Sequence, residues 1–412
     1  MKFIVTTAII FIHSLANAQK VPKAVFVIVD GIPADVIEKI ATPSLDSIAA
    51  KGGYTRAHVG GEKGGYSQTP TISAVGYNSL LTGTWVNKHN VWDNDIAAPD
   101  YHYATIFRLF SEQYPDKKTA IFSSWEDNRT KLAGDGMAAT GNLRISYRYD
   151  GLELDTVKFP HDPLKEYMHR IDLAVVDTAC ATIRTFAPDL SWVYLEYTDD
   201  MGHMYGDHEK FYDAVRMIDA QMSALWAAIQ YREQNFNEDW VIYITTDHGR
   251  TAESGKGHGG QSDRERSTWI VTDDDSLNQV FRSGNAGIVD IMPSLASHLN
   301  VNIPHDKLEE IDGVRLNGPV SAYAPTSTYS NGRISLGWTV ADKKGRVRIR
   351  ITTTNNFKQG GKDEYRLMKT VPVKDGRATI DVTRMPSTFY KIVMEFPLNT
   401  LNRWVDNRAT AN

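Results

Sequence analysis

The sequence has a single cysteine, Cys180, among 412 residues. A disulfide within the chain is therefore excluded, and so is a zinc site built from several thiolates. Apart from the N-terminus, no segment approaches the roughly 20 apolar residues that a membrane-spanning helix needs. The formal net charge is −5, so the basic footprint of a nucleic-acid-binding protein is not indicated.

The first 18 residues have the pattern of a signal peptide. Met1-Lys2 gives a charged start, residues 3–16 form an apolar stretch, and Ala16-Asn17-Ala18 is an A-x-A cleavage site. The apolar stretch is too short to cross a bilayer. We expect cleavage near Ala18 and an exported mature chain, periplasmic or secreted, without a membrane span.

Strand-like and helix-like patterns alternate over most of the chain. Residues 25–29 are a near-continuous apolar run, as in a strand buried on both faces. Further β-rich runs lie at 119–122, 192–195, 240–245 and 269–271, and helical patterns lie near 104–113, 163–186, 209–231 and 288–299. Thr42-Pro43 adds a helix start. This alternation predicts an α/β fold with a mostly parallel sheet flanked by helices.

The pattern changes near residue 325. Short β-rich segments follow, separated by turn sequences such as Asn331-Gly332 and Asp375-Gly376, and they lie at 334–340, 347–352, 367–373, 378–382 and 390–396. We therefore expect a catalytic domain over residues 19–325 and a small, all-β, sandwich-like domain over residues 326–412.

Carboxylate, imidazole and hydroxyl side chains follow several of the apolar runs, and these candidates are Asp30, Ser73, Asp199, His203, Asp247, His248 and His258. Sites in parallel sheets form at the carboxyl ends of strands, so the topology should gather the three aspartates. A turn-like excursion would bring Asp199 to His203. Each motif alone also fits an ordinary loop. Together they favour a site for two cations such as Zn²⁺ or Mn²⁺, with a serine nucleophile.

The order of these motifs resembles the alkaline phosphatase superfamily, and most closely its nucleotide pyrophosphatase/phosphodiesterase branch. The resemblance covers about residues 23–275. The matching positions are Asp30, Ser73 nine residues before Thr82-Gly83, His89 in N-K-H-N, Asn94 in W-D-N-D, Asp199 to His203 as D-x-x-G-H, Asp247 to Gly249 as D-H-G, and His258. The resemblance implies an alkaline-phosphatase-like fold and hydrolysis of a small phosphate ester or nucleotide.

The resemblance also implies residue roles. One divalent cation, expected to be Zn²⁺, would be held by Asp30, Ser73, Asp247 and His248, and a second by Asp199, His203 and His258. Ser73 would attack phosphorus and form a covalent phosphoryl-serine. The Asn94 amide, with the main-chain N–H of Ala74 as a further donor, would hold a phosphate oxygen.

Two departures from the branch leave alternatives open. The branch usually has threonine as nucleophile, followed by F-P-N-H, whereas Ser73 is followed by Ala74-Val75-Gly76-Tyr77. Serine also occurs in the monoesterase branch, so an alkaline-type phosphomonoesterase is the alternative. Residues 66–82 contain no Arg or Lys for a doubly charged phosphate, which favours a diester, although Arg56 or Lys63 could reach in.

The sequence was also compared with other functions and with other roles for nearby residues. A sulfatase would need C/S-x-P-S-R at Ser73, and a non-catalytic metal-containing binding protein would be expected to lack the nucleophile or a ligand. Thr69 and Thr71 are rival hydroxyls near Ser73. Three tryptophans near the expected mouth could stack on a nucleobase or pack internally, namely Trp85, Trp92 and Trp125. We expect Arg264 and Arg266 to pair with their neighbours Asp263 and Glu265.

Overall fold

The computed structural model describes residues 19–406, so the expected signal peptide lies outside the described residues. Eight strands form one sheet in the order β4-β3-β5-β1-β6-β7-β2-β8. Their bounds are β1 (Val21–Val29), β2 (Gly53–His58), β3 (Thr119–Ser123), β4 (Tyr147–Tyr149), β5 (Leu190–Leu195), β6 (Glu238–Thr245), β7 (Ser267–Thr272) and β8 (Ala286–Gly287). The neighbours of β1 run parallel to it, and β7 runs antiparallel to β6 and β2. The expected mostly parallel sheet is confirmed.

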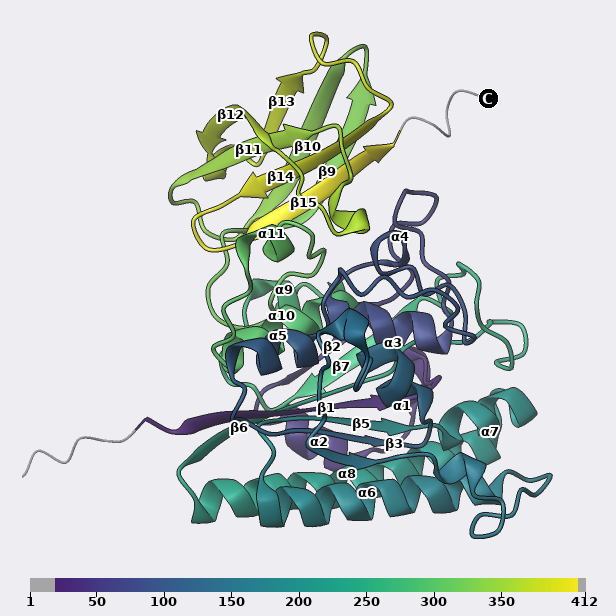
Figure 1. Cartoon of the computed structure of the whole chain (residues 1–412). Coiled ribbons are helices and arrows are strands. Elements are labelled where there is room, and N and C mark those ends of the chain that lie inside the picture. Colours follow the sequence, from purple (N-terminus) through teal and green to yellow (C-terminus); the bar gives the residue numbers. More distant parts are fainter. Residues whose placement is uncertain (1–18, 407–412) are drawn as a thin grey trace, which may run out of the picture.

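Helices cover both faces of this sheet (Figure 1). One face packs against α1 (Ala34–Lys39), α2 (Pro43–Ala49), α6 (Glu166–Phe186), α7 (Tyr197–Tyr205) and α8 (Glu209–Asn235). The other packs against α3 (Ser73–Thr82), α5 (Ile106–Gln113), α9 (Gln279–Arg282) and α10 (Ile291–His298). Two short helices, α4 (Val86–His89) and α11 (His305–Leu308), lie toward the C-terminal strands. In the described part of the chain, no helix is long and apolar enough to span a membrane.

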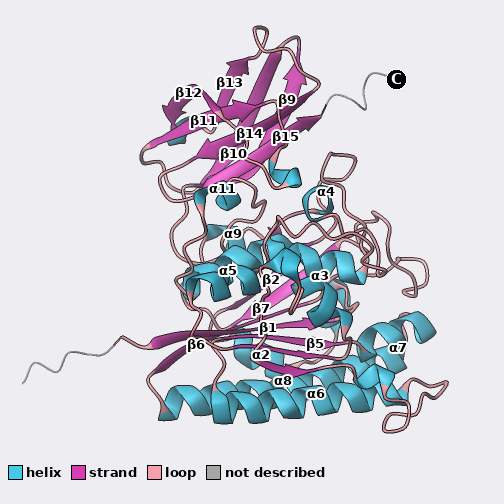
Figure 2. Cartoon of the chain, in the orientation of Figure 1, coloured by secondary structure: helices cyan, strands magenta, loops and turns pink. Residues whose placement is uncertain are grey.

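The C-terminal part consists of two antiparallel sheets, which Figure 2 shows as a separate layer of strands above the helices. One sheet has the order β13-β10-β9 and the other β12-β11-β14-β15. The strands are β9 (Ala322–Ser330), β10 (Arg333–Val340), β11 (Arg346–Thr352), β12 (Arg366–Pro372), β13 (Arg377–Asp381), β14 (Phe389–Glu395) and β15 (Thr400–Asp406). The expected all-β part is thus confirmed as a fold class, and the exact domain boundaries stay a prediction.

The C-terminal sheets are joined to the segment that leads into α3. Arg403 of β15 contacts Glu62 at 2.5 Å, and the ring of Trp404 stacks on Tyr66 with centroids 5.9 Å apart. Lys88 of α4 is fully buried and donates to Glu310 O, Asp312 Oδ1 and Asn402 Oδ1 at 2.6–2.8 Å. The strand β15 and the segments on either side of α3 therefore share one interface.

Candidate metal centre

The carboxyl ends of three neighbouring strands meet at one edge of the sheet. Asp30 directly follows β1, Asp247 comes two residues after β6, and Asp199 lies in the first turn of α7, just after β5. Since β1 lies between β5 and β6, the three carboxylates are brought together as the sequence predicted.

Three of the candidate ligands converge on an imidazole nitrogen of a fourth, His248. His248 Nε2 lies 3.3 Å from Asp30 Oδ1, 3.3 Å from Asp247 Oδ2 and 3.3 Å from Ser73 Oγ. All four side chains are buried. Asp30 Oδ1 and Asp247 Oδ2 have no hydrogen-bond partner among the described residues. Buried carboxylate oxygens need such a partner or a cation, so these atoms fit a metal ion.

The remaining three candidates form a second group beside the first. Asp199 Oδ2 lies 3.2 Å from His203 Nε2, which lies 3.1 Å from His258 Nε2. The rings of His258 and His248 stack with centroids 3.7 Å apart, so the groups adjoin. His203 is exposed whereas His248 is fully buried. The second group therefore opens toward solvent, where a substrate could approach.

The local electrostatics favour a cation. Burial, followed by the charge of Asp30, raises the pKa of Asp247 well above its ordinary value. Burial acts to lower the pKa of His248, but the nearby carboxylates of Asp247 and Asp30 raise it to about 9. Carboxylates this close together can all be ionised only when positive charge lies between them. A divalent cation would supply that charge.

Two buried tyrosines hold Asp30, and sequence reasoning missed both. The hydroxyls of Tyr77 and Tyr194 both donate to Asp30 Oδ2, the latter at 2.7 Å. Thr198 Oγ1 donates to the main-chain oxygen of Asp30 at 2.6 Å. These bonds fix the carboxylate so that Oδ1 faces His248. Both tyrosines lie within apolar runs of the sequence, a pattern that predicts rings packed in the hydrophobic core.

Arg250 is a second residue that sequence reasoning missed. Its fully buried guanidinium donates from Nη2 to the Oδ1 and main-chain oxygen atoms of Asp199, and from Nε to Gly31 O at 2.8 Å. A Cβ atom at Gly202 would overlap this guanidinium. Burial opposes ionisation of Asp199, but the bond to His203 and the charge of Arg250 hold its pKa below the usual range. The sequence feature that could have pointed to Arg250 is its position directly after the D-H-G motif.

Ser73 is the first residue of α3, after an extended Ile72. The main-chain N–H of Ala74 donates to Asn94 Oδ1 at 3.0 Å. The expectation that this N–H is free for substrate was therefore wrong, because it is used to position the Asn94 amide. Both rival hydroxyls are engaged: Thr71 Oγ1 donates to Gly260 O and Thr69 Oγ1 to Ser67 O.

Other residues singled out in the sequence lie away from the centre or have partners. Buried His89 lies 3.0 Å from Ser79 Oγ of α3, and burial lowers its pKa to about 3. Arg56 pairs with Glu38, and Lys63 lies 3.8 Å from Asp263. Of the tryptophans, Trp85 stacks on His58, Trp125 packs edge-on against Tyr77, and Trp92 is 52% exposed in the segment that carries Asn94.

Known proteins share this sequence pattern and fold. A family model described as type I phosphodiesterase/nucleotide pyrophosphatase matches residues 24–331. A solved 2-O GAG sulfatase aligns with a TM-score of 0.51 and 12% identity, over 89% of this chain and 86% of that one. A putative sulfatase from Bacteroides thetaiotaomicron aligns with a TM-score of 0.50 and 13% identity, over 84% of this chain and 85% of that one. Human ectonucleotide pyrophosphatase/phosphodiesterase 5 aligns with a TM-score of 0.48 and 13% identity, over 69% of this chain and 96% of that one. At such identities, the two sulfatase matches show the alkaline-phosphatase-like fold alone.

Proposed function

Because the chain belongs to the type I phosphodiesterase/nucleotide pyrophosphatase family of the alkaline phosphatase superfamily, we propose that it hydrolyses phosphodiesters or nucleotide pyrophosphate bonds through Ser73. The observation that carries this proposal is the convergence of Ser73 Oγ and two buried carboxylates on His248 Nε2. The adjoining group of Asp199, His203 and His258 supplies a second set of ligands. A mere binding protein has no need of a hydroxyl at this position.

The residues present fit two divalent cations, which we propose to be Zn²⁺. Asp30, Ser73, Asp247 and His248 would hold one, and Asp199, His203 and His258 the other. When bound, the cations would favour the ionised serine and offset the charge that develops on the leaving oxygen.

The side chains then have separate tasks. Ser73 Oγ, having lost its proton, forms a new bond to phosphorus while the bond to the leaving alcohol or phosphate oxygen breaks. Water later cleaves the phosphoryl-serine and releases the phosphorylated product. The amide nitrogen of Asn94, whose oxygen is held by Ala74 N–H, would donate to a phosphate oxygen and stabilise the charge it gains in the transition state.

The charges around Ser73 favour a diester over a monoester. Two basic side chains could have paired with the phosphate, but both have other partners. Arg56 pairs with Glu38, and Lys63 lies 3.8 Å from Asp263. Arg250 is close to the centre, but four of its five N–H groups donate to Asp199, Gly31 and Lys256. None of these three side chains, the cationic ones considered within residues 19–406, is thus free to pair with a dianionic monoester, whereas a diester carries one negative charge fewer. A sulfatase is disfavoured because Val75-Gly76-Tyr77 replaces the P-S-R of its nucleophile motif.

The test is a comparison of kcat/KM on zinc-loaded enzyme for bis-p-nitrophenyl phosphate and p-nitrophenyl phosphate. We expect the diester to be the better substrate. Ser73→Ala should abolish turnover of both, and Ser73→Thr, which keeps a hydroxyl, should retain activity. Ser47→Ala, at an exposed serine, is the matched control. A higher value on the monoester would move the protein to the phosphomonoesterase alternative, and full activity in Ser73→Ala would contradict the mechanism.

We further propose that the protein is exported, on the strength of the N-terminal pattern. N-terminal sequencing of the protein recovered from the periplasm or the medium should begin near Gln19. Retention of Met1 in protein confined to the cytoplasm would refute export while leaving the catalytic proposal intact.

A further inference from the structure

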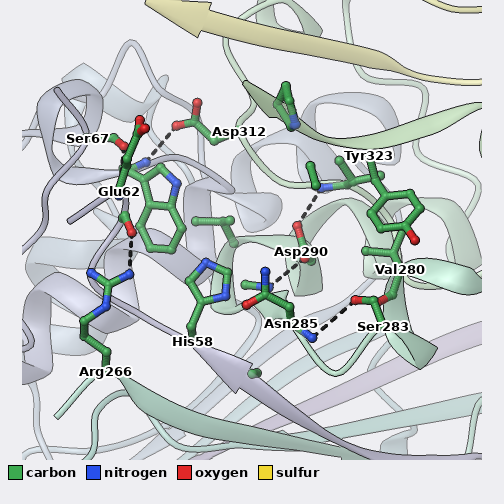
Figure 3. Close-up of a pocket in the computed structure, with 18 of the residues that line it drawn as sticks. His58, Glu62, Ser67, Arg266, Val280, Ser283, Asn285, Asp290, Asp312 and Tyr323 are labelled. Atoms are coloured by element: carbon green, nitrogen blue, oxygen red, sulfur yellow. Dashed lines mark hydrogen bonds between the residues drawn. The ribbon is translucent and has the colours of Figure 1, made fainter. Parts of the chain in front are cut away.

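A cavity of about 760 Å³ lies between the central sheet and the C-terminal sheets (Figure 3). Its walls come from the end of β2 and the segment after it, the loop before β7, the region of α9 and β8, and strands β9 and β15. None of the candidate metal ligands lines it. Its volume is in the range of small-molecule sites, so the cavity is large enough to hold a ligand of its own.

Two of the carboxylates that line this cavity have cationic partners. Glu62 pairs with Arg403 at 2.5 Å. Asp312 pairs with the buried Lys88 at 2.6 Å and also accepts the main-chain N–H of Trp85 at 3.0 Å. The negative charges of these two residues are therefore balanced within the protein.

The other two carboxylates are also accounted for. Asp290 accepts one main-chain N–H on each oxygen, from Gly287 and Val314, both at 2.7 Å. Asp263 has a fully exposed side chain and lies 3.8 Å from Lys63. Neither needs a cation inside the cavity.

Arg266, by contrast, has no acidic partner. It donates to Gly60 O and Gln261 Oε1 from Nη1 and to Gly61 O from Nη2, at 2.7–3.0 Å. The expected pairing with Asp263 or Glu265 was wrong, and no carboxylate within residues 19–406 forms an ion pair with it. A guanidinium has five N–H groups, so three bonds leave two donors at the cavity wall, and the charge of Asp263 acts on Arg266 without a direct contact.

His58 lies beside Arg266 with an unused nitrogen. The β2–β7 ladder pairs His58 with Ser267, the residue after Arg266, and Figure 3 shows both side chains at the cavity. His58 stacks on Trp85 with ring centroids 5.9 Å apart, and among the described residues its Nδ1 atom has no hydrogen-bond partner. Burial, and then the charge of Arg266, lowers its pKa to about 4. The main-chain oxygens of Ala286 and Asn285 interact with the ring of His58. A negative charge placed here would interact favourably with Arg266 and would favour protonation of His58, whose free Nδ1 could then donate to the anion.

We propose that this cavity binds an anionic small molecule, with a phosphate or carboxylate group held by Arg266 and His58. The guanidinium of Arg266 is half-buried, and an oxyanion is the complement that its free N–H groups fit best. The remainder of the ligand would lie against the polar side chains of Tyr66, Tyr323 and Asn285. The site would be additional to the metal centre and is independent of its chemistry.

Isothermal titration calorimetry on the zinc-loaded full chain tests the proposal, with inorganic phosphate, acetate and adenosine monophosphate as probes. We expect a class of sites that survives chelation of the metals. Arg266→Gln and His58→Phe, which keeps the stacking ring, should each weaken this class by about tenfold or more. Arg56→Gln should leave it unchanged, since Arg56 lines the same cavity but pairs with Glu38.

Each result of these titrations either supports or overturns the proposed anion site. Binding of phosphate or acetate that depends on both Arg266 and His58 supports the proposal, and tighter binding of adenosine monophosphate shows that the rest of the ligand is also held. The proposal fails when both variants titrate as the wild type, when all binding disappears on chelation, or when uncharged adenosine binds as tightly as its monophosphate. Should Arg266→Gln not fold by circular dichroism, the His58→Phe variant decides alone.

Discussion

The side-chain oxygen of Asn94 accepts a hydrogen bond from the main-chain N–H of Ala74 at 3.0 Å. Ala74 directly follows Ser73, so this bond fixes the amide beside the proposed nucleophile. With the oxygen occupied, the amide nitrogen is the group left to meet a phosphate oxygen.

Asn94→Asp should therefore be more harmful than Asn94→Ala. The aspartate keeps the acceptor for Ala74 but replaces an N–H donor by a negative charge beside the phosphate. We expect kcat/KM on the diester to fall by about 10²–10³-fold, with zinc content unchanged by elemental analysis. Asn94→Ala should lose less, since it adds no charge. Wild-type activity in Asn94→Asp would rule out the proposed contact.

Arg250→Met should destabilise the protein when metals are removed. The change leaves the Asp199 carboxylate without its buried partner, at a cost of about 3–5 kcal/mol in the free energy of unfolding. Zinc should restore part of this loss because the cation replaces the missing positive charge. Urea unfolding of chelated and zinc-loaded protein measures both, and Arg216→Met, at an exposed arginine, is the control. Equal loss with and without zinc would argue that Asp199 binds no metal.

Removal of the metals should abolish activity and lower the melting temperature. The carboxylates of Asp30, Asp199 and Asp247 would then repel one another in a buried site. A cation present at 100 times its dissociation constant adds about 2.7 kcal/mol to stability. Calorimetry with and without chelator, followed by zinc addition, measures the change. His203→Ala should show a smaller shift, and a chelated wild type with full activity would contradict a metal-dependent mechanism.

Lys88→Met should loosen the contact between the C-terminal sheets and the region of α3. The lysine is fully buried and has three oxygen acceptors, among them Asp312 and Asn402. Leaving Asp312 without it should cost about 3 kcal/mol, measured by urea unfolding. Lys63→Met, at a largely exposed lysine, should change stability by about 0.5 kcal/mol or less. Equal effects of the two changes would mean that Lys88 does not secure this interface.

The sequence predicted best where topology alone brings residues together. Asp30 and Asp247 follow apolar strands, and parallel strands end at a common edge, so their meeting required no knowledge of loops. The segment from Asp199 to His203 was expected to be a turn-like excursion, and this was wrong, because it lies within α7. Within this helix Gly202 is needed for space against Arg250, whose guanidinium a Cβ atom would overlap.

The sequence did not predict hydrogen bonds between side chains that are distant along the chain. Tyr77 and Tyr194 read as core residues because their rings are apolar, and only the fold reveals that both hydroxyls reach Asp30. Arg266 was expected to pair with its sequence neighbours, but its donors turn toward the carbonyls of Gly60 and Gly61. The strands β2, β9 and β15 were missed because polar residues interrupt their apolar pattern.

The contact between Glu62 and Arg403 has a consequence for the order of events during synthesis. The two residues are 341 positions apart, and contacts between distant parts of a chain form late in folding. The segment leading to Ser73 would thus gain its final support only after β15 has left the ribosome and joined its sheet.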